Sequence, residues 1–474
     1  MTPITPFPTP FGSDLGAKTQ PNLRCERSRR IVSQVCQIRL SKTYRIVNAL
    51  TGTQSLAARG TSWNAREVIM KVYIGIDWSE QKHDICFVRE DGVLLRHMVI
   101  AHHIQGFVEF DQARQALGLE AAQCVVGLET AHSLLVDYVW EQGYAQIYVL
   151  PPKVVKSSQG TYRQSGAKDD KADAWLIADI LRRSQDRYTP WRPDSGLTRQ
   201  IRAAVRYLQQ MNKDIVRNHN RLRSVLLRYY PAAVSVFSSL DTLVSLAFVQ
   251  TYPDPQQATG LSYGEFKTFL RDHHHSQPKK WPACYNRLQT AYPQAHPETV
   301  SAYTDQAQTL ARLLEIQVRS KTEWQKKLTR LYEQHPDRLI YARLPGAGEF
   351  LEPALLVKMG DDRNRFPSLK ILQATAGTCP VTQKSGKSRW IHFRQACDRE
   401  FRDIVQQWAK FSVERSPWAE AYYHAVRPHC RSDNEAIRRL ANRWLGVLWK
   451  LWQERISYDE ELHLKQHAQR MKKL

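Results

Sequence analysis

The chain has 474 residues, enough for roughly three domains, and its 68 lysines and arginines against 46 aspartates and glutamates give a formal net charge of +22. This basic excess indicates a polyanionic partner, and nucleic acid is the leading candidate. No stretch approaches the ~20 apolar residues of a spanning helix, so we expect no membrane association. The eight cysteines are scattered without a C-x-x-C pair, and the first residues do not form a secretory signal. We therefore expect reduced thiols and a cytoplasmic protein.

Residues 1–69 begin with a Thr/Pro-rich run and continue through a basic cluster with little periodicity. We expect this extension to be disordered. Two explanations for it stay open. Met70 stands directly before the first convincing strand, so the translation start could be placed too early; alternatively, the extension is a basic arm that contacts nucleic acid.

The segment 70–195 predicts a mixed α/β domain, because short apolar runs alternate with helical patterns. Its order β-β-β-α-β-α-β-α is that of ribonuclease-H-like nuclease folds, with helices packed on a mixed sheet. A Gly/Ser/Lys-rich loop is expected after Pro151-Pro152. The strands are predicted at 72–77, 84–89, 93–100, 124–129 and 145–150, and the helices near 104–117, 133–142 and 171–183.

The segment 196–337 predicts long helices. Apolar residues from Leu197 to Tyr229 step by four and three, which is the a/d seam of a coiled coil, with Asn218 as a polar member that could set register or oligomeric state. Residues 300–333 repeat the spacing with interruptions. The two stretches could pair as an antiparallel hairpin within one chain or between chains. Residues 231–299 between them match no clear template.

The segment 338–452 predicts a mainly helical C-terminal domain. It starts with a Gly-rich turn at 344–348 that opens a helix and could present backbone N–H groups to a DNA phosphate, although an ordinary helix-connecting turn is the plainer interpretation. Residues 453–474 are predicted to be a solvated basic tail.

Four carboxylates stand where a ribonuclease-H-like fold would bring them together. Asp77 ends the first strand, Glu129 ends the fourth, and Asp170 and Asp173 lie three apart at the start of a helix, and so on one face. Mg²⁺ takes oxygen ligands, and metal-assisted cleavage of phosphodiesters needs several carboxylates from different elements. Each acid could instead cap a turn or a helix. Asp169 is an alternative to Asp170.

A second constellation surrounds Ser385. It lies in Gln383–Arg389, a loop by composition, and Gly386 would allow close backbone approach. A serine that attacks a phosphate needs nearby cations to stabilise the charged transition state. From these residues alone, a loop that merely binds phosphate is the favoured interpretation. The cations within sequence reach are Lys384, Lys387, Arg389, Arg394 and Arg402.

Between Met70 and Trp452 the chain resembles the DEDD-type transposases of the bacterial insertion-sequence-110 group, which join a RuvC-like N-terminal domain to a C-terminal transposase domain. The resemblance is carried by the motifs YIGIDWSEQKHDICFV, VVGLETAH and AKDDKADAWLIADI in the first domain. In the last domain it is carried by RLPGAGEFLEPALLVKMGD and RFPSLKILQATAGTCPVTQKSGK. It departs from the expected pattern at Ala131-His132 and at Thr378-Cys379.

The resemblance implies that Asp77, Glu129, Asp170 and Asp173 hold Mg²⁺ and that Ser385 forms a covalent phosphoserine with DNA. It also implies dimers or tetramers with active sites shared between subunits, and a structured guide RNA as a second nucleic-acid partner. Two rival functions stay open. One is a RuvC-like, metal-dependent nuclease or resolvase, and the other is an inactive nucleic-acid-binding relative.

Overall fold

A computed structural model of the chain describes residues 70–131, 133–162, 169–386 and 388–471. The predicted extension 1–69 lies outside the described residues. From residue 72 to residue 149 the chain forms a five-stranded sheet in the order β3-β2-β1-β4-β5. β1, β2 and β3 pair antiparallel, while β4 and β5 run parallel to β1, so the predicted mixed sheet is confirmed. The strands are β1 (Val72–Trp78), β2 (Lys82–Arg89), β3 (Leu94–Ala101), β4 (Cys124–Leu128) and β5 (Gln146–Val149).

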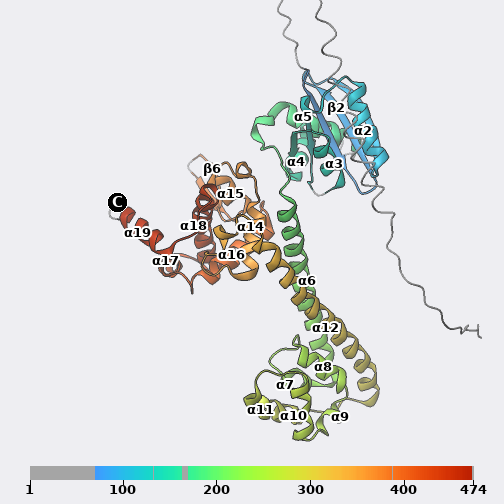
Figure 1. The fold of residues 1–474 in the computed structure, drawn as a ribbon, viewed down its shortest axis with the longest axis vertical. Helices are drawn as coiled ribbons and strands as arrows, with labels where there is room; N and C mark the ends of the chain where they lie inside the picture. Colours follow the sequence, from blue (N-terminus) through green and yellow to red (C-terminus); the bar gives the residue numbers. More distant parts are fainter. Residues whose placement is uncertain (1–69, 132, 163–168, 387, 472–474) are drawn as a thin grey trace, which may run out of the picture. The chain divides into compact units, whose positions relative to one another are not determined.

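Both faces of the sheet are covered by helices, with α2 and α5 on opposite sides (Figure 1). Side chains alternate along each strand, so Ile74 and Ile76 pack with the α2 and α3 side, and Tyr73 packs with the α5 side. Short 3₁₀ turns cover Ala121–Gln123 and Gln185–Arg187. The helices are α2 (Ile104–Ala116), α3 (Leu134–Glu141), α4 (Pro152–Tyr162) and α5 (Asp170–Ser184).

The prediction of a loop after Pro151-Pro152 is wrong over its first part, because α4 occupies Pro152–Tyr162. Proline is well suited to a first helical turn, where its missing N–H has no intrahelical partner. Val155 of α4 is 1% exposed and packs into the core on the α5 side of the sheet. Tertiary packing therefore outweighs the weak helix propensity of the Ser and Gly residues that follow.

Beyond the sheet, α6 (Gly196–Tyr229) and α12 (Pro297–Glu333) pair side by side within the chain (Figure 1). The start of α6 meets the end of α12, since Thr198 contacts His335, and their middles meet where Asn218 Nδ2 donates to Gln317 Oε1 at 3.1 Å. The pairing is thus antiparallel. Gln317, which interrupts the apolar spacing, is the polar partner of Asn218.

The buried stripe of α6 follows the expected seam from Ile201 to Leu222 and departs from it by one residue near each end. Near the helix start Thr198 is buried and Leu197 only partly so, and near its end Leu226 is buried where the heptad places Val225.

Residues 231–288, which matched no template, fold into short helices between α6 and α12. They pack around aromatic residues, and Phe248 and Phe266 are 0% exposed. A 3₁₀ turn covers Pro278–Lys280. The helices are α7 (Pro231–Val236), α8 (Leu243–Thr251), α9 (Pro255–Thr259), α10 (Tyr263–Asp272) and α11 (Trp281–Leu288).

The C-terminal segment is mainly helical, as predicted, and packs around tryptophans. The rings of Trp408 and Trp444 lie 5.0 Å apart, and Trp444 Nε1 donates to Ser412 Oγ at 2.8 Å. Short 3₁₀ turns cover Arg363–Arg365 and Arg427–His429. The helices are α13 (Arg338–Tyr341), α14 (Gly348–Met359), α15 (Leu369–Thr375), α16 (Arg399–Ser412), α17 (Pro417–Val426), α18 (Asp433–Glu454) and α19 (Glu460–Met471).

In this segment the turn before α14 fits the plainer interpretation, an ordinary helix-connecting turn, whereas the tail differs from its prediction. Gly346, in the turn before α14, has φ +75°, and an added Cβ would lie 2.5 Å from the backbone of Phe411. The turn therefore has a packing role against α16. The tail predicted to be solvated is docked at its start, because Tyr458 is 4% exposed and Glu460 accepts a hydrogen bond from Ser416 at 2.8 Å.

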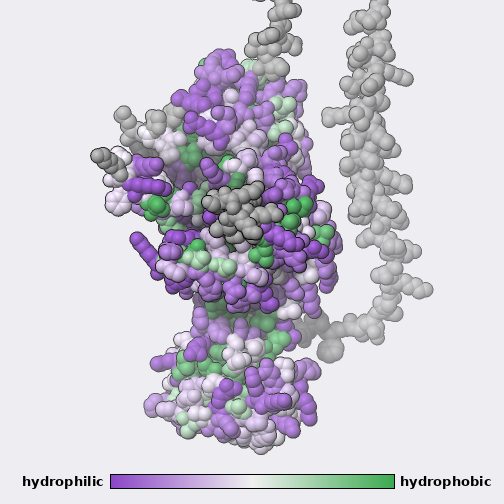
Figure 2. Space-filling model, turned by 90° about the vertical axis from the view of Figure 1, so that its left-hand side faces the viewer, coloured by the Kyte–Doolittle hydropathy of each residue, from purple (hydrophilic) through white to green (hydrophobic). Residues whose placement is uncertain are grey.

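The surface seen in Figure 2 is mostly hydrophilic, with hydrophobic residues in small patches. Among the helices that the structure describes, none is both long enough and apolar enough to cross a membrane.

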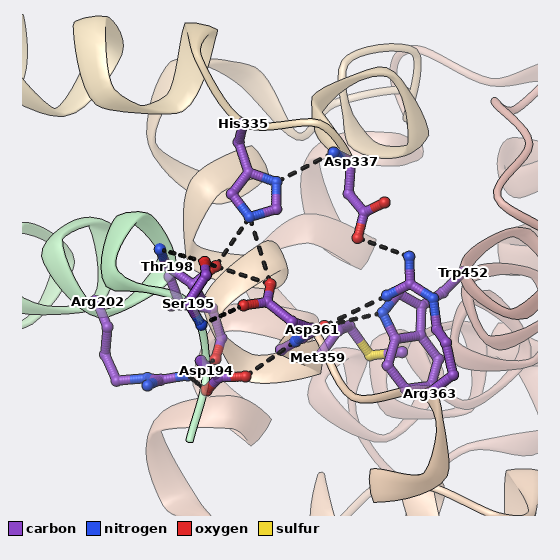
Figure 3. Close-up of polar contacts among 12 residues, drawn as sticks. Asp194, Ser195, Thr198, Arg202, His335, Asp337, Met359, Asp361, Arg363 and Trp452 are labelled. Atoms are coloured by element: carbon purple, nitrogen blue, oxygen red, sulfur yellow. Dashed lines mark hydrogen bonds and ion pairs between the residues drawn. The ribbon is translucent and has the colours of Figure 1, made fainter. Parts of the chain in front are cut away.

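A polar network ties the start of α6 to the loops that follow α12 and α14 (Figure 3). Asp361 accepts hydrogen bonds from the Ser195 backbone N–H and the Thr198 hydroxyl, both at 2.7 Å. His335 Nε2 lies 3.4 Å from Asp361 Oδ1 and 2.8 Å from Thr198 Oγ1. The Asp337 N–H donates to His335 Nδ1 at 3.1 Å, so the neutral ring carries its proton on Nε2.

This network predicts a loss of stability in acid. Burial opposes ionisation of Asp361, but the hydrogen bonds from His335, Ser195 and Thr198 outweigh it and hold the pKa of Asp361 well below its usual value. A depressed carboxyl pKa stabilises the fold at pH values above the unfolded pKa of about 3.9, and that contribution is lost as pH falls through the folded pKa. We expect Asp361→Asn to lower the free energy of unfolding at pH 7 by about 1–3 kcal/mol.

Urea unfolding between pH 7 and pH 3 measures this effect. The variant should lose less stability than the parent below pH 4, because Asn has no proton to gain. Asp362→Asn is the matched control, since Asp362 caps the next turn through Asn364 N at 3.0 Å and Asn caps equally well. Identical pH profiles for Asp361→Asn and the parent would contradict the prediction.

Candidate active site

Two of the predicted carboxylates lie at the ends of neighbouring parallel strands. Asp77 is the penultimate residue of β1, and Glu129 directly follows β4. The β1–β4 register pairs Ile76 with Leu128, so the next residues along the two chains, Asp77 and Glu129, are neighbours across the sheet edge. Parallel pairing therefore brings together two acids that stand 52 positions apart in the sequence.

Helix α5 lies against the same face. A Cβ added to Gly75 would meet the carbonyl oxygen of Ala174 at 1.9 Å, and one added to Gly127 would meet Leu181 at 2.5 Å. The two glycines let the helix sit directly on β1 and β4. Because alternate strand residues share a face, Asp77 and Glu129 lie on the side of Gly75 and Gly127, which is the side that α5 covers.

The helix also runs in the direction that the site requires. Its last turn lies by the start of β1, where Lys71 donates to Gln185 at 2.6 Å. Its first turn lies by the start of β2, where Lys82 pairs with Asp170 at 3.7 Å. The β1–β2 register places that region opposite the end of β1, so α5 runs antiparallel to β1. The first turn of α5, which carries Asp170 and Asp173, therefore lies at the end of the sheet that holds Asp77.

Asp173 is the most enclosed of the four acids, with 7% of its surface exposed. The side-chain amide of Gln159, on α4, donates to Asp173 Oδ1 at 3.0 Å. Burial raises the pKa of Glu129, and the charge of Asp173 raises it further. These two carboxylates are thus close enough to repel each other. Asp169 is the exposed N-cap residue of α5.

The donor chemistry of this group fits a hard divalent cation. The four predicted residues offer only carboxylate oxygens, which Mg²⁺ prefers, and a cation would relieve the repulsion between Glu129 and Asp173. Within the described ranges, no three Asp, Glu, His or Cys side chains already stand close enough together to hold a metal ion. The acids therefore converge on one end of the sheet without forming a closed cage.

Asp84 is a further acid of this region that the sequence interpretation missed. It is the antiparallel partner of Asp77 in the β1–β2 register, so both lie on the α5 side of the sheet. Asp84 is 6% exposed, and its Oδ1 lies 2.9 Å from His97 Nε2. The β1–β2 hairpin pattern was visible in the sequence. Counting residues outward from the turn between the two strands would have paired Asp84 with Asp77.

Ser385 lies in a β-hairpin, so the prediction of a loop is wrong. β6 (Val381–Ser385) and β7 (Ser388–His392) pair antiparallel, and Ser385 faces Ser388 across the turn. Gly386 in this turn has φ +56°, a conformation that glycine adopts without strain. Lys387, the other turn residue, lies outside the described residues. The hairpin places Ser385 at an exposed tip.

The predicted cations are distributed unevenly around Ser385. Lys384 pairs with Arg389 in the hairpin, one step from Ser385, so both lie on the opposite face of the two-stranded sheet. Arg394 Nε donates to the carbonyl oxygen of Cys379 at 3.1 Å, and the Arg402 guanidinium lies 5.0 Å from the centre of the Phe393 ring. The last two cations are thereby fixed near the base of the hairpin. The described cations thus lie on the face opposite Ser385 or at the base of its hairpin, whereas the four acids lie at one end of the larger sheet.

Two family models match the chain. The one described as a transposase, of the IS110 DEDD type, covers residues 74–231, and the one described as the transposase IS116/IS110/IS902 family covers residues 340–424. The chain belongs to the IS110 family of transposases. The first match contains all four candidate acids, and the second contains the Ser385 hairpin. The helices α8 to α11 lie between the two matched segments of this transposase.

Proteins of several insertion elements are similar to this transposase over most of its length. A mini-circle protein of Streptomyces coelicolor named as a transposase for IS117 is 28% identical over 405 residues, 83% of this chain and 96% of that protein. The 42 kDa protein of insertion element IS900 from Mycobacterium paratuberculosis is 25% identical over 82% of this chain and 97% of its own. The 44.8 kDa protein of IS116 from Streptomyces clavuligerus is 24% identical over 81% and 95%.

Proposed function

We propose that this transposase cuts and rejoins DNA with a carboxylate site on a ribonuclease-H-like, RuvC-like sheet domain and a serine nucleophile on the β6–β7 hairpin. The observation that carries the proposal is the convergence of Asp77, Glu129, Asp170 and Asp173. The acids come from three separate segments and lie at one end of the sheet. Two of them follow the parallel strands β1 and β4, and the other two are on the first turn of α5. Surface carboxylates that merely cap turns need no such convergence.

The carboxylates would hold Mg²⁺, which supplies Lewis-acid stabilisation of charge on the phosphate that is cut. Around them, the residues of the chain set the geometry. Gln159 orients Asp173 through its hydrogen bond, and the close contact at Gly75 fixes α5 against β1. The positive end of the α5 dipole faces the same region and favours anions there. In a +22 protein, this local acidity stands out against the overall charge.

Ser385 would then carry the covalent step. Its Oγ forms a bond to phosphorus as the bond from phosphorus to the strand oxygen breaks, and the released strand end takes a proton to become a hydroxyl. The phosphate stays attached to the serine as an ester, so attack by the hydroxyl of another strand can rejoin DNA. Lys384 and Arg389 on the other hairpin face, and Arg394 and Arg402 at its base, would bind the phosphates that flank the reacting one.

Two partners beyond DNA are part of this proposal. The net charge of +22 is large enough to serve a guide RNA as well as DNA. A homo-oligomer would let the carboxylates of one subunit and the serine of another form a shared active site. Loss of cleavage when the element's RNA is omitted tests the first expectation, and complementation between an acid variant and a serine variant tests the second.

The test of the function is a covalent adduct. The full chain is incubated with Mg²⁺, DNA of its element's ends and its candidate RNA, then denatured and separated by electrophoresis. We expect a protein–DNA adduct that survives denaturation and disappears with EDTA. Cleavage without any adduct would favour a metal-dependent resolvase that uses water. Binding without cleavage or adduct would favour an inactive nucleic-acid-binding relative.

A further inference from the structure

The β6–β7 hairpin exposes large apolar side chains beside the proposed nucleophile. The exposed fractions of Trp390 and Ile391 are both 63%, and that of Phe393 is 40%. Among the tryptophans that the structure describes, Trp390 alone is exposed, while Trp408, Trp444 and Trp452 form the helical core. Burying such a side chain is favourable, so an exposed one marks a contact surface.

The hairpin register fixes which side each residue faces. Trp390 pairs with Gln383, and Ser385 pairs with Ser388, which is the pair two positions nearer the turn. Residues two apart on a strand share a face, so Trp390 lies on the same face as Ser385, whereas Ile391 lies on the other. Diagonal neighbours of this kind are about 7–8 Å apart, within reach of an aromatic side chain. Stacked bases are about 3.4 Å apart along a strand. A ring 7–8 Å from Ser385 is therefore close enough to contact a nucleotide next to the attacked phosphate.

The residues around Trp390 indicate the chemistry of the partner that it contacts. At the base of the hairpin, two guanidinium groups lie close to the Phe393 ring, that of Arg402 at 5.0 Å and that of Arg438 at 4.4 Å from its centre. Arg438 Nε is buried and has no hydrogen-bond partner among the described residues. Burial lowers the pKa of Arg438, and the charge of Arg402 also lowers it. A phosphate beside these guanidinium groups would offset the charge of both cations.

Aromatic side chains alternating with cations are typical of surfaces that bind single-stranded nucleic acid, where bases stack on rings and phosphates meet the cations. A second copy of this basic surface would instead be repelled. We propose that Trp390 stacks on an unpaired DNA base next to the phosphate that Ser385 attacks, and that Arg402 and Arg438 hold a neighbouring phosphate of the same strand. This inference rests on the proposed role of Ser385. Beyond that role, it predicts that the DNA duplex opens locally at the cleavage point.

Base stacking is measured with 2-aminopurine, whose fluorescence rises on leaving the duplex stack and is quenched on an aromatic ring. A tiled set of element-end DNAs carries the probe at successive positions around the cleavage point. Ser385→Ala protein is used, so the signal requires no cleavage and survives if Ser385 is not the nucleophile. We expect one or two positions at which the probe is quenched with Trp390 present, becomes bright in Trp390→Ala and stays quenched in Trp390→Phe.

Cleavage is measured separately with Ser385 intact. Trp390→Ala should cleave duplex DNA about 5- to 150-fold more slowly, the range that corresponds to stacking one base. A substrate mispaired at the cleavage point should recover most of this loss, because its bases are already unpaired. Trp390→Phe and the opposite-face control Ile391→Ala should stay within a few-fold of the parent.

Three results would overturn the inference. The first is an unchanged 2-aminopurine signal in Trp390→Ala. The second is an equal cleavage defect in Ile391→Ala, which would show that any apolar loss damages the hairpin. The third is a change of sedimentation mass in Trp390→Ala without a change in the probe signal, which would assign the tryptophan to a contact between copies of the chain. Failure of the proposed function is distinct, because then the parent would form no covalent adduct or Ser385→Ala would still form one.

Discussion

Asp173→Asn should abolish strand cleavage while the protein still folds and binds DNA. The substitution keeps the size of the side chain and an oxygen that can accept the Gln159 hydrogen bond. It removes the negative charge on which the proposed Mg²⁺ site depends. Changes to residues that only orient a metal ligand typically cost about 10- to 100-fold, so loss of a ligand should cost at least 100-fold. Gel-based cleavage assays at saturating DNA measure this effect.

Asp186→Asn is the matched control for Asp173. Asp186 is exposed and lies just beyond the other end of the same helix, so its replacement changes the charge equally without touching the acid cluster. Its cleavage rate should stay within about two-fold of the parent, as for surface substitutions generally. Calorimetric titration with Mn²⁺ gives a readout independent of activity, and Asp173→Asn alone should weaken it. Equal activity of the two variants would show that Asp173 is not a metal ligand.

The acids could be identified from sequence because their signals are local. Asp77 and Glu129 each end an apolar run that forms a central strand, and Asp170 and Asp173 have helical spacing. Their convergence follows from parallel pairing of β1 with β4 and from a helix laid across both. Gly75 and Gly127, which permit that contact, carried no local signal of their role, because a glycine in a strand has several explanations.

Other elements depend on packing that sequence periodicity does not record. The tip of the β6–β7 hairpin is rich in Lys, Ser and Gly, a composition typical of a loop, and the register of the hairpin is visible only when the two strands are paired. The short helices α7 to α11 would be marginal alone and are stabilised by a shared aromatic core. α4 begins at a proline, which in the sequence indicates the end of a regular element. Gln159 of this helix nevertheless donates a hydrogen bond to Asp173. The sequence therefore indicated four candidate acids but not the helix that supplies a hydrogen-bond partner to one of them.

Ser385→Ala should remove the covalent protein–DNA adduct completely. The substitution deletes the only atom proposed to bond to phosphorus and leaves the hairpin backbone unchanged. Strand cleavage by this route should fall to background, since alanine offers no nucleophile. DNA binding should change little, because Lys384, Arg389 and the arginines at the hairpin base remain. The adduct is measured with end-labelled DNA after denaturation, and the attached residue is identified by mass spectrometry of the digested protein.

Ser388→Ala provides the matched control, because Ser388 is the cross-strand partner of Ser385 and lies on the same exposed face. A phosphate that met this face without geometric selection would react with either hydroxyl. The proposed site selects Ser385, so only this hydroxyl should form the ester. Full adduct in Ser388→Ala and none in Ser385→Ala is the expected pattern. An adduct that persists in Ser385→Ala and vanishes in Ser388→Ala would transfer the nucleophilic role across the hairpin and leave the carboxylate site unaffected.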